Sequence, residues 1–338
     1  MQTSINTSIG PGTEFLYGKR ADVRLGFGCA SLMQLPSRRR RQELLGEALE
    51  QGIRHFDLAR MYGLGATEAE LGRFARGRRG EIGIATKFGI EPPSPLLARA
   101  QAPARLAMAK LPALKRTLKR AAGARGGGSA NREPRRYDGA GARRSLETSL
   151  RALGTDYVDC FFVHDPGPGD RVALNDVCAA CEELVAAGKV RAWGISGEPD
   201  PCIGLAAAAE PALLQVRDEI FAPVTLLPDG RPAIGFGIIA SPLARIEAHL
   251  SGDPAARRRW SEATGCDVGD RGALAALLLR EALDRNRSGG VVLATTKPFR
   301  LRPVVAAAMA AGEDGDAAAA AFRDCVAQDF RIVPTLHG

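Results

Sequence analysis

Four side chains that can transfer or hold a proton lie at the ends of three short apolar stretches of the chain or shortly after them. Asp57 follows IRHF, Tyr62 lies five residues later in MYGLG, Lys87 ends IGIATK and His164 ends YVDCFFVH. A tyrosine phenol with its usual pKa of about 10 is a weak acid at neutral pH, and a neighbouring ammonium group lowers that pKa. If the four residues converge, we expect Tyr62 to act as a general acid that Lys87 activates.

The other two residues supply what such an acid needs around it. Asp57 is expected to be the counter-ion of Lys87, whose charge is costly once it is removed from water. His164 can hydrogen-bond the oxygen of a substrate carbonyl near Tyr62. Taken singly, each residue also has a structural explanation: a capping aspartate, a packed tyrosine, a solvated lysine or a strand-end histidine. Together they predict a site of acid catalysis.

Eight short apolar segments must position these residues, and most precede a segment with helical spacing of its apolar residues. The strands are predicted at 23–28, 53–57, 82–87, 157–163, 190–195, 212–216, 234–239 and 291–295. Parallel strands need helical crossovers, and closure removes exposed sheet edges, so this α/β pattern predicts a (β/α)8 TIM barrel. Asp57, Lys87 and His164 then end three strands on the rim where active sites of this fold are built.

The helices between these strands carry their own start and stop signals. Ser37 is expected to cap the first of them and Gly52 to end it. Gly154 is expected to end a later helix that carries a stripe of leucines, Leu146, Leu150 and Leu153.

The excess positive charge of the chain is confined to one segment. The net charge is +8, yet residues 91–136 contain 11 Lys or Arg and 2 Asp or Glu, and the remainder contains 35 and 36. This segment also departs from the strand–helix alternation. We therefore predict a single domain over 1–338 with a basic loop insertion at about 91–136, next to the rim that carries the site. Because aromatic residues are not interleaved with its charges, nucleic-acid binding is not favoured.

The cysteines and the hydropathy indicate a compartment. Seven cysteines are scattered and odd in number in a chain too large to need disulfides, which favours a reducing cytoplasm. No window reaches the roughly 18–20 apolar residues that cross a bilayer, so no membrane partner is predicted. Cys178 and Cys181 form a CxxC within a predicted helix and have no second pair, so no metal site is predicted.

Three of the segments named above resemble a known family. FDLARMYG, IATKFG and YVDCFFVHDP are similar to the segments of the aldo-keto reductases that hold an Asp, Tyr, Lys and His tetrad in this order. Further similarity runs through TEAELG, RRSLETSLRALGTDYVD, GKVRAWGIS and TTKPFRLR. The resemblance implies an enzyme that reduces an aldehyde or ketone to an alcohol, or the reverse, with hydride from a nicotinamide cofactor. It assigns catalytic roles to Asp57, Tyr62, Lys87 and His164, with Tyr62 as the general acid.

The resemblance also implies a cofactor site. It matches two residues to positions that hold the nicotinamide carboxamide, and others to the ASPLAR segment at 240–245 and to a phosphate-binding loop. The implied cofactor residues are Ser196, Gln215, Ser241, Leu243, Thr295 and Arg300. Arg300 matches an arginine near the adenosine 2′-phosphate, which favours NADP(H) and leaves NAD(H) open.

Four positions of the cofactor site depart from the family. Gly197 stands where Asn is usual, Ala240 where a Tyr stacks on the nicotinamide, and Pro303 and Val304 where Glu and Asn hold the adenine. An alternative hypothesis follows from them: a non-catalytic nicotinamide-nucleotide-binding or regulatory protein on the same barrel. The predicted partner is a small-molecule carbonyl compound, and no oligomeric state is predicted.

Overall fold

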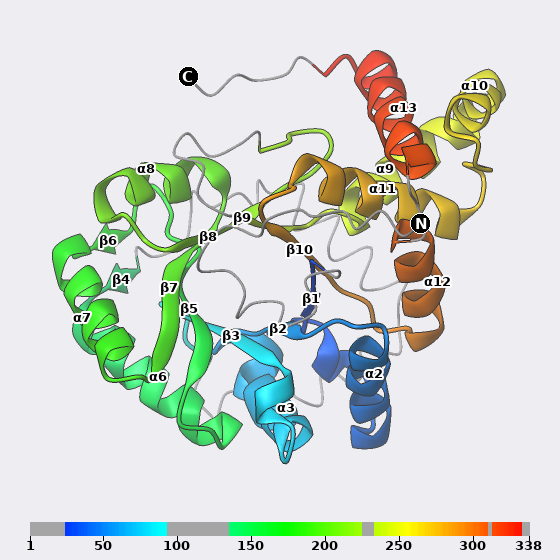
Figure 1. Ribbon diagram of the computed structural model, residues 1–338. Helices are drawn as coiled ribbons and strands as arrows, with labels where there is room; N and C mark the ends of the chain where they lie inside the picture. Colours follow the sequence, from blue (N-terminus) through cyan, green and yellow to red (C-terminus); the bar gives the residue numbers. More distant parts are fainter. Residues whose placement is uncertain (1–23, 93–134, 225–232, 310–312, 333–338) are drawn as a thin grey trace, which may run out of the picture.

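The computed structural model describes residues 24–92, 135–224, 233–309 and 313–332. Eight parallel strands close into a barrel in the order β1–β10–β9–β8–β7–β5–β3–β2, and helices surround it (Figure 1). The barrel strands are β1 (Leu25–Gly28), β2 (His55–Asp57), β3 (Gly83–Phe88), β5 (Val158–His164), β7 (Val190–Gly197), β8 (Leu213–Arg217), β9 (Ala233–Phe236) and β10 (Gly290–Leu293).

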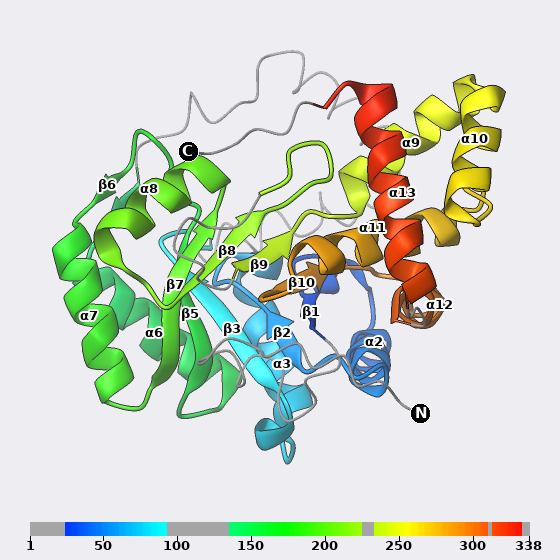
Figure 2. The same ribbon diagram turned by 45° about the horizontal axis from the view of Figure 1, so that its top comes forward.

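The helices lie between consecutive strands and after the last one. The α-helices are α2 (Arg38–Glu50), α3 (Thr67–Ala75), α6 (Gly139–Leu153), α7 (Leu174–Ala186), α8 (Pro199–Ala209), α9 (Ala240–Gly252), α10 (Pro254–Thr264), α11 (Arg271–Arg285), α12 (Pro298–Met309) and α13 (Glu313–Phe330). Short 3₁₀ helices are η1 (Leu32–Gln34), η2 (Tyr62–Gly65) and η3 (Arg79–Glu81). Figures 1 and 2 show α10 and α13 on the outer side of α9 and α11.

The predicted fold class is confirmed, and all eight predicted strands are barrel strands. The predicted helix signals also hold, since the Ser37 hydroxyl accepts a hydrogen bond from the Arg40 amide and Gly154 ends α6 in the left-handed conformation. The strand predicted at 234–239 is shorter, because β9 ends at Phe236 and the chain turns through Gly237 into α9.

Two short strands were not predicted. β4 (Arg136–Tyr137) and β6 (Arg171–Val172) form a separate parallel pair outside the barrel. Most of the insertion predicted at 91–136 lies outside the described residues, so the single-domain organisation with that insertion stays a prediction.

Side chains inside the barrel follow the alternation of the strands. Successive residues of a strand point to opposite faces, so residues two apart share the inner face. The lower interior is apolar and contains Ala85, Cys160, Phe162, Ala192, Leu213, Ile234 and Val292. One pleat further toward the carboxyl ends, the same strands β3, β5 and β8 carry Lys87, His164 and Gln215. The interior therefore changes from apolar to polar at the carboxyl rim.

A second apolar core holds the outer helices. α9, α10, α11 and α13 meet around Trp260 and Phe322, both fully buried, whose rings make an edge contact at 5.8 Å between centroids. Apolar packing therefore holds α13 against the barrel helices, in addition to ion pairs such as Arg323–Asp284.

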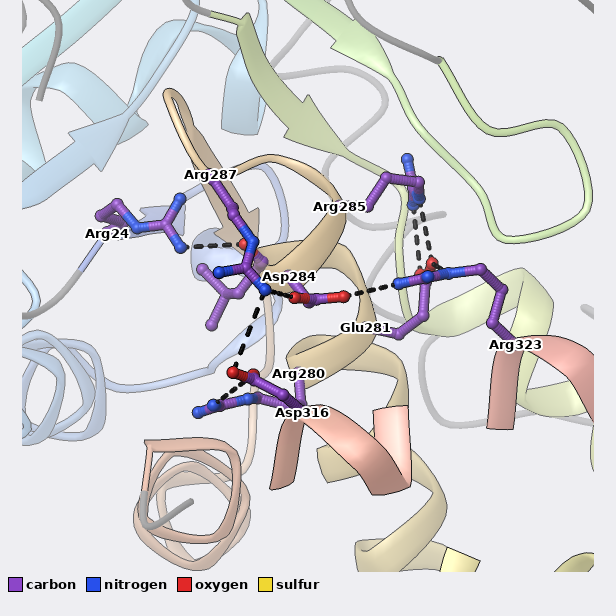
Figure 3. Close-up of polar contacts among 9 residues, drawn as sticks. Arg24, Arg280, Glu281, Asp284, Arg285, Arg287, Asp316 and Arg323 are labelled. Atoms are coloured by element: carbon purple, nitrogen blue, oxygen red, sulfur yellow. Dashed lines mark hydrogen bonds and ion pairs between the residues drawn. The ribbon is translucent and has the colours of Figure 1, made fainter. Parts of the chain in front are cut away.

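Helix α11 carries a row of charges that joins it to α13 (Figure 3) and, through Arg285, to Asp218 directly after β8. The buried Glu281 carboxylate accepts hydrogen bonds from Arg285 Nε and from Arg323 Nε, each at 3.0 Å. Arg285 also pairs with the buried Asp218, and Arg323 with Asp284 at 2.8 Å. A buried carboxylate between two guanidinium groups is well compensated, and its removal takes one of two carboxylate partners from each arginine.

The same end of α11 holds the beginning of the barrel. Arg24, directly before β1, donates to the carbonyl oxygens of Leu283 at 2.8 Å and Gly289 at 3.2 Å, and also to that of Asn286. An arginine at these carbonyls satisfies acceptors that a helix end leaves open. The contact ties the first strand to the last helix–strand unit.

We expect Glu281→Ala to lower the free energy of unfolding by about 2 kcal/mol, below the roughly 3–5 kcal/mol of an isolated buried pair. The reason is that Arg285 keeps Asp218 and Arg323 keeps Asp284. Urea unfolding measures the loss. Asp324→Ala, an exposed residue next to Arg323 on α13, is the matched control and should change stability by less than about 0.5 kcal/mol. Equal losses in the two variants would contradict a role for the network.

Candidate active site

The four predicted catalytic residues meet at the carboxyl rim of the barrel. Asp57 ends β2, Lys87 lies near the end of β3, His164 ends β5, and Tyr62 begins η2 in the loop after β2. Strand register completes the row, because His164 pairs with Ser196 on β7, and Ser196 pairs with Gln215 on β8.

Asp57 is the centre of a hydrogen-bonded group at the floor of the site. Its Oδ1 accepts from Lys87 Nζ at 2.5 Å and from Gln215 Nε2 at 2.8 Å. Lys87 also donates to the Leu58 carbonyl at 2.7 Å, and Ser196 Oγ donates to Gln215 Oε1 at 2.6 Å. Burial alone lowers the pKa of Lys87, but the charges and hydrogen bonds of Asp57 and Tyr62 outweigh it and raise that pKa above its ordinary value. Lys87 is therefore an ammonium ion.

The loop that carries Tyr62 needs an unusual backbone. Gly63 and Leu64 within η2 and Gly65 at its end all have positive φ angles. A Cβ atom on Gly63 would lie 2.3 Å from the Met33 side chain and 2.6 Å from Thr67, so only glycine fits there. This tight turn sets Tyr62 over Lys87, whose Nζ lies 5.2 Å from the centre of the phenol ring.

A buried ion pair anchors the Tyr62 loop to the barrel. Arg60 Nη1 contacts Glu68 Oε2 at 2.6 Å, and the other carboxylate oxygen of Glu68 accepts from Thr86 Oγ1 at 2.8 Å. Arg60 lies two residues before Tyr62, Glu68 in the first turn of α3, and Thr86 directly before Lys87. The height of the phenol relative to the ammonium group is therefore set by this chain of contacts.

The prediction that Lys87 lowers the pKa of Tyr62 was incomplete. Burial raises that pKa, Lys87 lowers it by a smaller amount, and Asp57 raises it again, so the net direction is upward. The sign of the Lys87 effect was right, but the sequence does not show how deeply the phenol is enclosed. The phenol thus keeps its proton at neutral pH, as a proton donor must.

His164 is a neutral imidazole in this site. Burial, and then the positive charges of Lys87 and Arg135, lower its pKa to about 2. Its ring stands edge-on to Tyr62 with 6.0 Å between centroids, and its Nδ1 has no hydrogen-bond partner among the residues that the structure describes. A neutral imidazole beside the phenol can hydrogen-bond a substrate oxygen without adding a charge.

These residues form the wall of one cavity of about 470 Å³. Asp57, Tyr62, Lys87 and His164 line it together with Ser196 and Gln215. Apolar side chains of β9 and the segment after it, Phe236, Ile238 and Ile239, line another part. The size and the mixture of apolar wall and few polar groups are typical of a small-molecule site.

The structure separates the six implied cofactor residues into two groups. Ser196 and Gln215 line the cavity, whereas the other four do not. Ser241 is exposed in the first turn of α9, and Leu243 is buried in the outer apolar core. Thr295 Oγ1 accepts from the Lys297 amide, and Arg300 is exposed with its guanidinium 5.8 Å from the Phe299 ring.

The two cavity-side departures from the family have local explanations. A Cβ atom on Gly197 would lie 3.0 Å from the Asp165 Cα and 3.3 Å from Cys202 Sγ, so a larger residue would displace the backbone after His164. Asp165 itself has a positive φ of 51°. Ala240 lines the cavity at the start of α9 and leaves open the space that a larger side chain would take.

The start of α9, beside the cavity, suits a phosphate group of a dinucleotide. Helix α9 has 13 residues and no side chain capping its N-terminus, and that end lies beside Ile239 and Ala240 in the cavity wall. Uncapped amides at a helix N-terminus favour phosphate groups. Arg300 has no ion-pair partner in the described part of the chain and can meet an additional phosphate.

Comparisons with known proteins agree with this geometry. The model of the Aldo/keto reductase family matches residues 24–217. The chain is 31% identical over 217 residues to "Aldo-keto reductase yakc [NADP(+)]" of Schizosaccharomyces pombe, over 62% of this chain and 52% of that protein. It is 44% identical over 55 residues to "Methylglyoxal reductase YeaE" of Escherichia coli, over 16% of this chain and 18% of that protein. The chain matches about half or less of the length of these relatives.

The solved structures support the barrel. The aldo-keto reductase AKR11C1 from Bacillus halodurans superimposes with a TM-score of 0.65 at 21% identity, covering 93% of this chain and 94% of that one. The glycerol dehydrogenase AKR11B4 from Gluconobacter oxydans gives the same TM-score and coverage at 18% identity.

The barrel and the four residues at its rim define a class of α/β-barrel proteins with a buried lysine–aspartate pair beside a tyrosine. The chain belongs to the aldo/keto reductase family.

Two further findings concern the described residues alone. No helix among them is long and apolar enough to cross a membrane. The same residues contain no cluster of three or more potential metal ligands, and Cys178 and Cys181 are unpaired thiols on α7.

Sequence reasoning missed four charged residues that line the cavity, Arg135, Asp165, Glu198 and Arg217. Arg135 was counted within the basic insertion. One sequence signal could have separated Arg135 from the rest of the insertion: it lies two residues before Tyr137. Tyr137 is fully buried and its hydroxyl donates to the His164 carbonyl at 2.8 Å, which attaches this segment to the site.

Proposed function

We propose that this protein reduces an aldehyde or ketone to an alcohol, or catalyses the reverse reaction, with a nicotinamide cofactor. The observation that carries the proposal is the charged Lys87–Asp57 pair beside the protonated Tyr62 and the neutral His164 in one cavity. Relatives named as reductases support it.

In the proposed mechanism, Tyr62 and His164 bind the carbonyl oxygen by hydrogen bonds. A reduced nicotinamide, held by Ser196 and Gln215, would supply the hydride that the carbonyl carbon accepts, and the carbonyl π electrons would pass to its oxygen. Tyr62 donates its proton to that oxygen, which gives the alcohol, and Lys87 stabilises the phenolate that remains. Asp57 keeps Lys87 charged and in place. The phenolate then recovers a proton from solvent.

The cofactor is proposed to lie along the rim from β7 to α12. Ser196 and Gln215 would hold the carboxamide, and their mutual hydrogen bond fixes both side chains toward the cavity. The first turn of α9, with Ser241 and Leu243, would meet the pyrophosphate, and Thr295 and Arg300 the adenosine phosphate. We propose NADP(H) as the cofactor, supported by Arg300 and by the NADP(+) in the name of the fission-yeast relative.

The direct test follows the consumption of NADPH by purified protein with a broad panel of aldehydes and ketones, beside a fluorescence titration of NADPH. Turnover with any carbonyl compound supports the enzyme. Tight NADPH binding without turnover across the panel would overturn the proposal and favour the alternative of a nucleotide-binding or regulatory protein.

We expect Arg300→Ala to weaken NADPH binding by about 10-fold or more and NADH binding by less than about 2-fold, because a charge-assisted contact to the 2′-phosphate would be lost. Fluorescence titration of both nucleotides measures this. Arg302→Ala is the control, since Arg302 already pairs with Glu47 at 3.2 Å on α2. Equal weakening of both nucleotides by Arg300→Ala would remove the proposed preference for NADP(H).

We also infer that the protein works in the cytoplasm on a small-molecule substrate. All seven cysteines are free thiols, which supports a reducing compartment.

A further inference from the structure

Three cationic side chains line the catalytic cavity, and two of them are fully engaged. Lys87 is bound to Asp57 and Leu58. Arg217 donates to Glu198 at 2.8 Å and to Glu219 at 3.3 Å, and its guanidinium lies 5.4 Å from the centre of the Phe236 ring. The third, Arg135, is held far more loosely and has no part in the proposed proton transfer.

The backbone of Arg135 is fixed on both sides. Its amide donates to Asp170 Oδ1 at 2.8 Å, and its carbonyl accepts from the Arg171 amide at 2.8 Å, directly beside the β4–β6 pair. Two residues later, Tyr137 donates to the His164 carbonyl at 2.8 Å. The base of the Arg135 side chain is thereby attached to the end of β5, the strand that presents His164.

The guanidinium of Arg135 uses only one of its nitrogens. Nη1 lies 3.3 Å from the Asp165 carbonyl oxygen and 3.6 Å from Asp165 Oδ2, both long contacts. Nε and Nη2 have no hydrogen-bond partner among the described residues, and a quarter of the side chain is exposed to solvent. These two nitrogens form the edge that binds both oxygens of a carboxylate or of a phosphate.

Asp165 leaves this edge open. It follows His164 directly, and its backbone takes a positive φ of 51°. Its carboxylate contacts Nη1 only, so Nε and Nη2 of this cavity-lining arginine remain available as a pair of donors to an anion. A neutral acceptor would gain less from them than an anion, because hydrogen bonds between two charged groups are stronger.

We propose that Arg135 is a specificity-determining residue that binds an anionic group, a carboxylate or a phosphate, of the carbonyl substrate. The inference rests on the proposed reductase function and names its substrate class: small aldehydes or ketones that carry an acidic group near the carbonyl. A planar guanidinium suits this task better than an ammonium group, because it binds two oxygens in a fixed geometry.

The experiment compares three para-substituted benzaldehydes with NADPH: 4-carboxybenzaldehyde, 4-formylphenyl phosphate and the neutral methyl 4-formylbenzoate. Wild type should prefer one or both acids over the ester in kcat/KM. Arg135→Met should lower kcat/KM for the preferred acid by about 10- to 100-fold, the range expected for a lost hydrogen-bonded charge contact, and leave the ester within about 2-fold. The acid that loses more identifies the anionic group.

Three variants separate recognition from a general effect on the fold. Arg135→Lys keeps the charge but loses the paired donors, so it should fall between wild type and Arg135→Met. Asp165→Asn removes the competing carboxylate with a residue that tolerates its positive φ, and should raise kcat/KM for the acid. Arg136→Met, which changes the neighbouring exposed arginine outside this cavity, should leave all three substrates unchanged. The KM for NADPH should stay constant in all of them.

The outcomes distinguish the inference from the function on which it rests. No turnover of any of the three aldehydes or of a wider panel by wild type overturns the proposed function. Turnover with acid-to-ester ratios that Arg135→Met leaves unchanged overturns the inference alone. A rise in the KM for NADPH in Arg135→Met, with unchanged acid-to-ester ratios, would assign Arg135 to the cofactor instead.

Discussion

Tyr62→Phe is expected to lower the turnover of carbonyl reduction by about 10²- to 10⁴-fold, the usual contribution of a positioned acid, and to leave NADPH affinity within a few-fold. The phenol supplies a proton only as the oxygen gains electrons, and its proposed role does not include the nucleotide. Steady-state kinetics and fluorescence titration measure the two quantities separately.

The matched control is Tyr157→Phe. Tyr157 precedes β5 at the opposite end of the strand from His164, where it accepts a hydrogen bond from Arg191 at 3.2 Å, so turnover should not change. Because burial raises the pKa of Tyr62, reduction should decline only at alkaline pH, as the phenol loses its proton. Wild-type turnover in Tyr62→Phe would show that another group donates the proton.

Lys87→Met is expected to remove activity and, in addition, to lower the free energy of unfolding by about 3–5 kcal/mol, because the Asp57 carboxylate stays buried without its counter-ion. Lys87 has only 3% of its side chain exposed and Asp57 only 8%, so water cannot replace the lost contact. Urea unfolding and turnover are both measured on the same preparation.

The double variant Asp57→Asn with Lys87→Met separates the two effects. It removes the stranded charge while an amide can still meet Gln215, so it should recover most of the lost stability and none of the activity. A double variant as unstable as Lys87→Met alone would show that the cost comes from packing rather than from the unpaired charge.

The barrel could be predicted because its signals are local. Each strand is a short apolar run, and each residue of the tetrad follows or ends such a run, so the alternation of side chains places them at one rim. β4 and β6 could not be predicted in this way. They are two-residue strands, RY and RV, whose pairing depends on the return of the chain 35 residues later, as in the contact of the Arg135 amide with Asp170.

The electrostatics of the site were less accessible to prediction. The pKa of Tyr62 depends mainly on how deeply the phenol is buried. The presence of a nearby lysine in the sequence does not reveal that burial. Gly197 is a further example: in sequence it looks like a departure from the family, while in the structure Asp165, which follows the neighbouring strand β5, lies too close for a larger side chain. Likewise, Val304 stands where the family has an adenine contact, and here it packs against the apolar cores.

The hydrogen bond from Arg24 to the Asn286 carbonyl joins residues 262 positions apart. During synthesis from the N-terminus, β1 therefore cannot pair with β10 or contact the end of α11 until almost the whole barrel has left the ribosome. Until then, β1 presents an open strand edge, which is prone to pair with other chains. This order of assembly implies that chaperones bind nascent chains that end before β10, whereas in the closed barrel of the finished protein β1 is paired on both edges.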